Sequence, residues 1–278
     1  MIAAAVDRTI SGVAEVALAG TGNAAGTGNV SKTSGIDFSG RRILVTGAGR
    51  GIGKAFIDGL LARGAARVYA SAREIAAIDK TDSRVVPVKL DVTRPADIIA
   101  ARAICGDIDT LINNAGLSCN THLLQTDQPD AARMEIETNY LGTLNMCRAF
   151  VPVIEGNTSP DRPGVLINMA SILARVNLPM MGSHCAAKAA VYSLSSGLRA
   201  ELADRHVRVF AVLPGAVDTE MTRDFPPPKA APADIVQEIL DEVSAGTPEI
   251  YPGDMAKGLA EGLIEDRDAV LAEVAGYV

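Results

Sequence analysis

The sequence predicts one α/β domain built on a parallel, doubly wound sheet of about seven strands. From residue 42 onward, short apolar runs alternate with longer helical segments, and the runs are apolar throughout rather than at every second residue. Strands that helices cover on both faces have this composition, and strand–helix alternation with short connections favours a parallel sheet with right-handed crossovers. Ligands bind at the carboxyl ends of such strands, so functional residues are expected there.

The expected elements follow one another in a regular order. The apolar runs that should form strands are 43–46, 67–71, 85–90, 110–112, 165–169 and 207–213, with a short seventh candidate at 249–251. The helical patterns lie between them and after them, at 52–63, 95–104, 130–154, 185–204, 233–244 and 255–275.

Composition and charge exclude several classes of protein. The 278 residues are 48% hydrophobic and 21% charged, values typical of a globular chain and not of a disordered one. The formal net charge is −7 and 4% of the residues are aromatic, with no Trp, whereas nucleic-acid binding uses a basic face and stacking aromatics. No apolar run is long enough to span a membrane. Neither nucleic acid nor a membrane is an expected partner.

The cysteines indicate the redox setting. They are widely spaced, and no two of them form a C-x-x-C pair: Cys105, Cys119, Cys147 and Cys185. This spacing predicts neither a disulfide framework nor a metal site, and it is typical of a protein in the reducing cytoplasm.

Residues 1–36 differ in composition from the rest of the chain. They are rich in Ala, Gly, Thr and Asn, and the tetrapeptide Gly-Thr-Gly-Asn occurs at 20–23 and again at 26–29. Asp7 and Glu15 interrupt the apolar stretch, and no basic segment precedes it, so a secretory signal is not expected. We predict a flexible extension before a domain at 37–278; a short amphipathic docking segment around 9–18 is the alternative.

A glycine-rich turn follows the first expected strand. It reads Thr46-Gly-Ala-Gly-Arg-Gly-Ile-Gly53 and leads directly into an expected helix. Glycines allow the backbone to turn sharply and to approach a pyrophosphate, while the helix directs its first N–H groups at that anion. The position between strand and helix favours a dinucleotide site of the Rossmann type over a purely structural turn.

Further motifs follow the other strands in order. They are Asp91-Val92-Thr93, Asn113-Asn-Ala-Gly116, Asn139, Ser171, Lys188 and the segment Pro214-Gly215 with Thr219. Together with the spacing of the glycines, this set resembles the short-chain dehydrogenase/reductase family from about residue 37 to the C-terminus. The resemblance implies cofactor contacts at Gly47, Arg50, Gly51, Ile52, Gly53, Arg73, Asp91, Val92, Asn113, Ala115, Gly116, Lys188, Pro214, Gly215, Val217 and Thr219.

The end of the second strand indicates which nicotinamide cofactor is used. NAD-specific sites place an acidic residue there to bind the ribose 2′-hydroxyl, whereas this chain has Ala72 followed by Arg73. Arg73 and Arg50 suit a 2′-phosphate by charge and geometry, so NADP(H) is the predicted cofactor. The alternative is that both are solvated surface arginines.

The resemblance also implies a catalytic set of Asn, Ser, Tyr and Lys. Ser171 would bind the substrate oxygen, Lys188 the nicotinamide ribose, and Asn139 a water that leads to bulk solvent. The residue four positions before Lys188, where the family has its tyrosine, is His184. Neither Tyr140 nor Tyr192 has a lysine four residues downstream, so the predicted set is Asn139, Ser171, His184 and Lys188.

His184 leaves several alternatives open. Histidine can transfer protons near neutral pH, but imidazole would end roughly 2 Å short of the position of a phenolic oxygen. A bridging water or a deeper-lying substrate would close that gap. Otherwise the chain is a catalytically impaired NADP(H)-binding regulatory protein, or a Tyr-to-His variant of an active enzyme.

Three segments should border the substrate, namely 117–124, 172–182 and 216–229. Their apolar members are Leu117, Leu123, Leu124, Ile172, Leu173, Met180, Met181, Met221 and Phe225, and their charged members are Arg175, Asp218, Glu220, Arg223 and Asp224. Ser171, Leu173, Met181 and Met221 are the predicted substrate contacts, although the methionines suit a packed core equally well. The Phe225-Pro-Pro-Pro228 run would form a stiff lid.

The sequence therefore predicts an oxidoreductase that moves a hydride between NADP(H) and a hydrophobic ketone, aldehyde or secondary alcohol. The expected partner is that small molecule. The long, Ala-rich segments 130–154 and 185–204 resemble the helices through which the family forms a homodimer or homotetramer.

Overall fold

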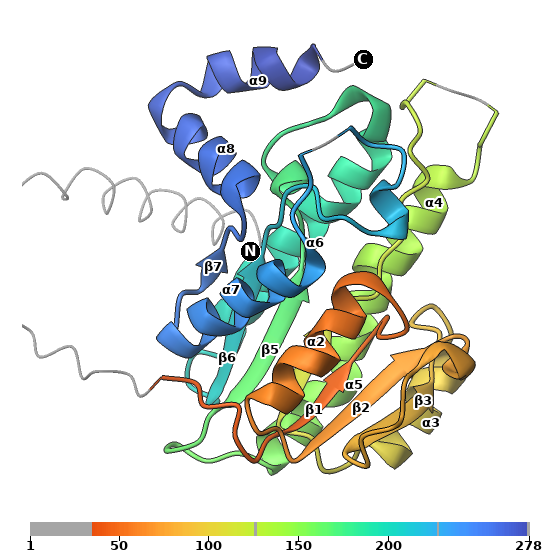
Figure 1. Ribbon diagram of the computed structural model, residues 1–278, viewed down its shortest axis with the longest axis vertical. Helices are drawn as coiled ribbons and strands as arrows, with labels where there is room; N and C mark the ends of the chain where they lie inside the picture. The colour runs from red at the N-terminus through yellow and green to blue at the C-terminus, as the bar shows by residue number, and fades with distance from the viewer. Residues whose placement is uncertain (1–34, 125–126, 227, 277–278) are drawn as a thin grey trace, which may run out of the picture. The chain divides into compact units, whose positions relative to one another are not determined.

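The computed structural model describes residues 35–124, 127–226 and 228–276. Seven parallel strands form one sheet in the order β3-β2-β1-β4-β5-β6-β7, which confirms the predicted fold class (Figure 1). The strands are β1 (Arg42–Val45), β2 (Arg67–Ala72), β3 (Val85–Lys89), β4 (Thr110–Asn113), β5 (Gly164–Met169), β6 (Val207–Val212) and β7 (Glu249–Ile250). The order reverses between β1 and β4, so their carboxyl ends open a crevice at that point.

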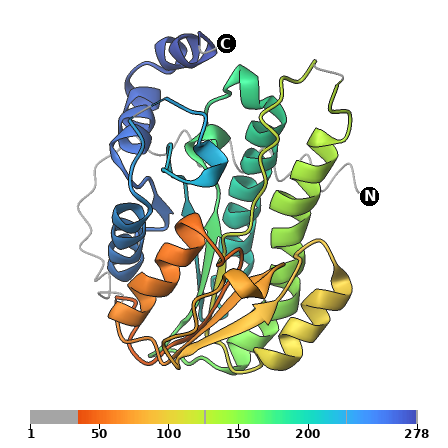
Figure 2. The same cartoon turned by 45° about the vertical axis from the view of Figure 1, so that its right-hand side comes forward.

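Helices cover both faces of the sheet (Figures 1 and 2). The face shared by α2 (Gly51–Ala62) and α7 (Pro232–Ala245) is opposite the face covered by α3 (Pro95–Ile104), α5 (Gly142–Gly156) and α6 (Gly182–Glu201).

The two faces explain why the strands are apolar throughout. Ile43 and Val45 of β1 pack into the core below α2 and α7, whereas Leu44 between them packs into the core below α3 and α5. All three side chains are fully buried, as expected of a strand with a helix layer on each side.

One predicted helix is wrong in its continuity, whereas another is continuous but contains a π-helical distortion. Segment 130–154 consists of α4 (Ala131–Glu135), a π-helical segment (Ile136–Leu141) and α5. Segment 255–275 consists of α8 (Asp254–Glu265) and α9 (Arg267–Ala275). Asp266 separates these two, since its extended backbone ends α8 and its carboxylate accepts the Ala269 N–H at 3.0 Å to begin α9.

The extension predicted at 1–36 lies outside the described residues except for its last two. Of these, Ile36 is buried in the core, and its N–H donates to the Ser244 carbonyl at 3.1 Å. A flexible arm before this point stays a prediction. In the described part of the chain, the helices are too short or too polar to cross a membrane.

A buried ion pair closes the amino-terminal end of the sheet. Arg41 is 2% exposed and donates to the Asp109 carboxylate at 3.3 Å and to the carbonyls of Asp37 and Pro163. Burial lowers the pKa of Arg41, and the neighbouring Asp109 counteracts that effect.

Replacing Arg41 should be costly because it would leave the Asp109 carboxylate buried without this partner. We expect Arg41→Met to lower the free energy of unfolding by about 3 kcal/mol, measured by urea denaturation. Arg42 is the control, since its pair with Asp107 is solvent-exposed. Arg42→Met should cost less than about 1 kcal/mol, and equal costs for the two variants would contradict the assignment.

Candidate active site

The glycine turn after β1 has the backbone shape that a pyrophosphate site requires. Gly47 and Gly51 have φ values of +65° and +53°, which favour glycine over residues with a side chain. A side-chain carbon at Gly53 would collide with the Gly47 carbonyl. No side chain caps the start of α2, so its first N–H groups remain available to an anion. The turn therefore fits a dinucleotide phosphate.

Thr46 and Asn114 fix this turn to the end of β4. The Thr46 hydroxyl oxygen accepts the N–H groups of Asn114 and Ala115, both at 2.9 Å. The Asn114 amide donates to the Thr46 carbonyl at 2.9 Å and to the Gly47 carbonyl at 3.2 Å. Asn114 was quoted only as part of its motif, and the structure assigns it this anchoring role.

The predicted 2′-phosphate region has arginine but no acid on the strand end. Ala72 is half-buried at the end of β2, and Arg73 after it is exposed. Arg50 forms an ion pair with Glu220, and both side chains are largely exposed. The two guanidiniums thus differ in what cofactor binding would require, because Arg50 would have to exchange the Glu220 carboxylate for a phosphate.

The predicted adenine turn is held by local bonds. The Asp91 carboxylate accepts from the Thr93 N–H at 3.0 Å and from its hydroxyl at 2.7 Å. Partial burial acts to raise the pKa of Asp91, but these hydrogen bonds outweigh it and the pKa is lowered. Val92 is buried and packs against Gly142 at the start of α5.

Asn113 is directed into the sheet rather than toward the crevice. Its amide donates to the Asn168 side chain on β5 at 2.9 Å and contacts the Cys147 sulfur at 3.4 Å. The Asn168 amide donates onward to Ser195 of α6 at 3.0 Å. The side chain of Asn113 therefore joins β4 to β5 and α5, and through Asn168 to α6, so any contact with a cofactor would have to come from its backbone.

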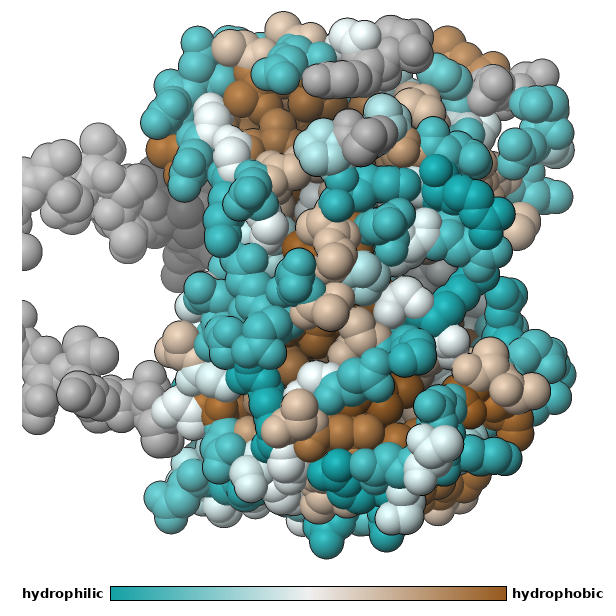
Figure 3. All heavy atoms as spheres, viewed as in Figure 1, coloured by the Kyte–Doolittle hydropathy of each residue, from teal (hydrophilic) through white to brown (hydrophobic). Residues whose placement is uncertain are grey.

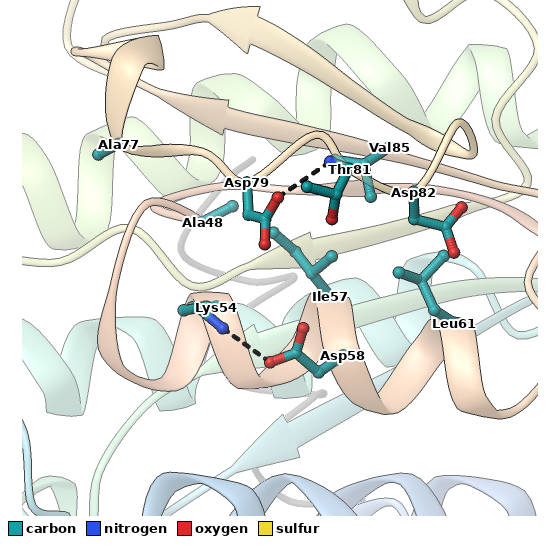
Figure 4. Close-up of a pocket in the computed structure, with 10 residues that line it drawn as sticks. All are labelled: Ala48, Lys54, Ile57, Asp58, Leu61, Ala77, Asp79, Thr81, Asp82 and Val85. Carbon is teal, nitrogen blue, oxygen red and sulfur yellow. Dashed lines mark hydrogen bonds and ion pairs between the residues drawn. The ribbon is translucent and has the colours of Figure 1, made fainter.

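A small cavity of about 90 Å³ lies beside the glycine turn, between α2 and the segment that leads to β3 (Figure 4). Its polar groups satisfy one another: Lys54 pairs with Asp58 at 3.0 Å, and Asp79 accepts the Thr81 N–H at 2.9 Å. Such a volume is far smaller than a dinucleotide site needs. Among the described residues there is also no group of three or more His, Cys, Asp or Glu placed to hold a metal ion.

Asn139 and His184 converge on the backbone of Leu117, just after β4. The Asn139 side chain accepts the Leu117 N–H at 2.8 Å and donates to the Leu117 carbonyl at 2.9 Å. His184 Nδ1 lies 3.0 Å from the same carbonyl. Asn139 belongs to the π-helical segment, a distortion common at functional sites.

Lys188 and Ser171 complete the group. Lys188 Nζ donates to the Met169 carbonyl at the end of β5, at 2.8 Å. A side-chain carbon at Gly116 would lie 3.6 Å from that ammonium and 3.2 Å from Asn139 Oδ1. Glycine at this position therefore leaves room for both side chains close to the loop. The Ser171 hydroxyl follows β5, accepts the Leu173 N–H at 3.1 Å, and donates weakly to the Pro214 carbonyl at 3.4 Å.

Burial sets the charges of this group. Burial and the nearby Lys188 ammonium lower the pKa of His184 to about 4, although the hydrogen bond to Leu117 acts in the opposite direction. Burial alone lowers the pKa of Lys188 to about 8. At neutral pH His184 is uncharged. Because Nδ1 faces a carbonyl, that nitrogen holds the proton and Nε2 has the free lone pair.

The predicted nicotinamide segment leaves β6 and touches two distant elements. Thr219 lies against Gly51 of the glycine turn. Met255 of α8 packs on Gly215, and its sulfur accepts the Ala216 N–H at 3.3 Å. Met255 was not predicted, since nothing in the sequence shows that the start of α8 returns to this segment. Val217 is buried and pairs with Ala230.

The predicted substrate contacts differ in exposure. Leu173 is half-buried, Met181 is buried, and Met221 is 42% exposed. Figure 3 shows apolar side chains gathered at the end of the molecule where α8 and α9 lie. Pro227 of the expected lid lies outside the described residues. Just after the lid, Lys229 forms an ion pair with the Asp218 carboxylate at 3.1 Å, which holds this end of the segment against the chain after β6.

Comparison with known proteins identifies this arrangement. The sequence model of the short chain dehydrogenase family matches residues 41–230, which span the glycine turn and all four predicted catalytic residues. The chain belongs to the short-chain dehydrogenase/reductase family. It is accordingly an oxidoreductase of the type that uses a nicotinamide dinucleotide.

Two curated members of the family resemble the chain over most of its domain. The NADP-dependent 3-hydroxy acid dehydrogenase of Schizosaccharomyces pombe is 36% identical over 197 residues, 66% of this chain and 74% of that protein. The 3-oxoacyl-[acyl-carrier-protein] reductase FabG of Escherichia coli is 32% identical over 195 residues, 68% of this chain and 78% of that protein.

A solved structure of the family is also similar. The short chain dehydrogenase of Burkholderia cenocepacia, in complex with NADP, is 45% identical with a TM-score of 0.82. The match covers 86% of this chain and 99% of that one.

The neutral state of His184 predicts a loss of stability in mild acid. The unfolded chain takes up a proton at this side chain near pH 6.5 and the folded protein only near pH 4, so stability falls as the pH decreases between these values. Between pH 7 and about pH 4.5 the loss from this group is roughly 2 kcal/mol. In urea unfolding at the two pH values, the free energy of unfolding of His184→Gln should therefore fall by roughly 2 kcal/mol less than that of the natural protein. His206→Asn, at an exposed histidine, should behave like the natural protein.

Proposed function

We propose that this protein is an NADP(H)-dependent oxidoreductase that interconverts hydrophobic ketones or aldehydes and the corresponding alcohols. The observation on which the proposal rests is the convergence of Asn139, His184 and Lys188 around the loop after β4, with Ser171 at the end of β5. A reacting carbonyl would lie between the Ser171 hydroxyl and His184.

Three observations support NADP(H) over NAD(H). The end of β2 has no acidic residue, Arg73 after it is exposed, and Arg50 extends from the glycine turn. The structure from Burkholderia cenocepacia and the enzyme from Schizosaccharomyces pombe are both described with NADP. Arg50 would exchange its ion pair with Glu220 for bonds to a 2′-phosphate, so it would be paired with an anion both before and after the cofactor binds.

The relatives also suggest a substrate class. The name of one curated relative refers to a 3-hydroxy acid, and the name of the other refers to a 3-oxoacyl group on the acyl carrier protein. Both names thus refer to an oxygen at the third carbon, as a ketone or an alcohol, and the predicted substrate contacts Leu173 and Met221 are apolar. A 3-oxoacyl or 3-hydroxyacyl compound is therefore the first substrate to test.

NADPH, when bound, supplies a hydride to the carbonyl carbon and leaves the carbonyl oxygen in need of a proton. Ser171 would orient that oxygen by hydrogen bonding. His184 is neutral with its Nδ1 proton on Leu117, so its Nε2 accepts a hydrogen bond and has no proton to donate directly. Below about pH 8 Lys188 is protonated, and a water between its ammonium and the carbonyl oxygen would carry a proton to that oxygen, which leaves the lysine neutral.

One observation favours the impaired alternative, an NADP(H)-binding regulatory protein. A group whose pKa is about 4 is a poor proton donor to a carbonyl at neutral pH. In the direction of alcohol oxidation the same nitrogen can accept a hydrogen bond from the hydroxyl, so the proposed site suits oxidation better than reduction.

Assembly and location remain predictions. We propose a homodimer or homotetramer that pairs through α4, α5 and α6, as the long Ala-rich segments suggest. A cytoplasmic setting agrees with four cysteines that are all free thiols.

Arg73→Asp should weaken NADPH binding about 10- to 100-fold, because one charge-assisted contact to the 2′-phosphate is lost and a like charge replaces it. NADH binding should change less than about threefold. Cofactor fluorescence titration measures both. Arg102→Asp on α3 is the control for net charge and should alter neither. Equal weakening of both cofactors would rule out the 2′-phosphate assignment.

His184→Tyr decides between the active and impaired alternatives. A phenol in place of the imidazole would add a proton donor, so we expect turnover to rise by about tenfold or more, followed by NADPH absorbance. The panel contains 3-oxoacyl thioesters and hydrophobic ketones, aldehydes and diketones with NADPH, and the corresponding alcohols with NADP⁺, with Lys188→Met as the inactive control.

Turnover by the natural protein makes it an enzyme, and turnover by the variant alone makes it an impaired NADP(H) binder. If neither protein oxidises NADPH or reduces NADP⁺ although both bind the cofactor, the proposed hydride transfer is wrong for these substrates.

A further inference from the structure

Glu135 is a buried carboxylate for which the proposed reaction has no use. It ends the short helix α4 and is 0% exposed. Removing a carboxylate from water is costly, and an apolar side chain of similar size would avoid that cost. Stability alone therefore does not account for an acid at this position.

The two oxygens of Glu135 bind different sides of the candidate active site. One accepts the backbone N–H of Cys119 at 2.7 Å, and the other accepts the Ser183 hydroxyl at 2.5 Å. Cys119 is two residues from Leu117, and Ser183 immediately precedes His184. Hydrogen bonds to a carboxylate are among the stronger ones in proteins.

We propose that Glu135 is a positioning residue, which fixes the spacing between the Leu117 carbonyl and the His184 ring through Cys119 and Ser183. The inference rests on the proposed function in that it concerns the same proton-transfer site. It adds a residue that neither the family motifs quoted above nor the reacting groups include.

The contacts around the loop support this role. Asn139 holds the Leu117 peptide from the side of the π-helical segment, at both its N–H and its carbonyl. Among the hydrogen bonds of the described residues, the loop at 116–119 is joined to α6 by the His184 contact itself and by the bridge through Glu135. Without that bridge, the bond between His184 and Leu117 would be the one hydrogen bond left between this loop and α6 among the described residues.

A bond of 3.0 Å between a ring nitrogen and a carbonyl is sensitive to small displacements. Misplacement of a reacting group by about 1 Å costs up to a hundredfold in rate. A rigid buried carboxylate with one donor on each side is suited to prevent such displacement.

Ser183→Ala is the principal test, and Ser195→Ala is its matched control. Both serines are buried in α6 and hydrogen-bonded, but Ser195 binds Asn168 and the Val191 carbonyl away from His184. Imidazole ¹⁵N NMR of the full-length protein, with His184 assigned through His184→Gln, reports its tautomer and pKa without any substrate. We expect Ser183→Ala to lower the fraction with a proton on Nδ1. It should also lower the His184 pKa further, because the hydrogen bond to Leu117 that it weakens acts to raise that pKa. Ser195→Ala should change neither.

Two substitutions of Glu135 separate geometry from charge. Glu135→Gln keeps an acceptor for the Cys119 N–H and offers an amide to Ser183, so the His184 signals should stay as in the natural protein. Glu135→Met removes both bonds and should reproduce the Ser183→Ala shift or exceed it. Unchanged His184 signals in Ser183→Ala, or equal changes in Ser195→Ala, would overturn the proposal.

A kinetic measurement tests the link to turnover. In whichever of the natural or His184→Tyr backgrounds is active, Ser183→Ala should lower kcat about tenfold and change KM less than about twofold, as expected when a reacting group is misplaced. If neither background turns over, the proposed function fails while the NMR result still decides the role of Glu135.

Discussion

The peptide unit of Leu117 is the point on which the candidate active site depends. It lies just after β4, its N–H donates to Asn139, and its carbonyl accepts from both Asn139 and His184. Elements far apart in the chain are thus placed relative to one another by a single backbone group. A backbone carbonyl suits this purpose because its position follows from the strand and does not depend on a side-chain rotamer.

Desolvation then determines what chemistry the group can do. His184 and Lys188 are both buried, and burial disfavours the charged form of each. The effect is decisive for His184, whose unperturbed pKa lies near neutrality, and less so for Lys188, which stays protonated at neutral pH. The same burial that orients the imidazole therefore leaves it uncharged, so orientation and acidity are in conflict at this position.

The cofactor end of the crevice follows a different principle. The glycine turn is held rigidly by Thr46 and Asn114, whereas the side chains predicted to recognise the 2′-phosphate are exposed. A rigid backbone cradle can bind a pyrophosphate in any dinucleotide, while mobile arginines can adapt to one particular phosphate at a cost in side-chain entropy. The Arg50–Glu220 pair also joins the turn to the segment after β6, so both sides of the crevice meet there.

The sheet, its seven strands and the positions of the glycine turn and the motif residues could all be predicted from the sequence, because continuous apolar runs and glycine spacing are local signals. The sequence did not reveal the break at Asp266 or the π-helical segment around Asn139, where hydrogen bonding overrides helical periodicity. The fold was needed to show that Asn113 faces the sheet interior, that Arg50 meets Glu220, and that Met255 returns to Gly215. It likewise brought Glu135 between Cys119 and Ser183, 16 and 48 residues away in the chain. Such contacts depend on how the elements pack, and no pattern along the chain encodes a pairing between residues so far apart.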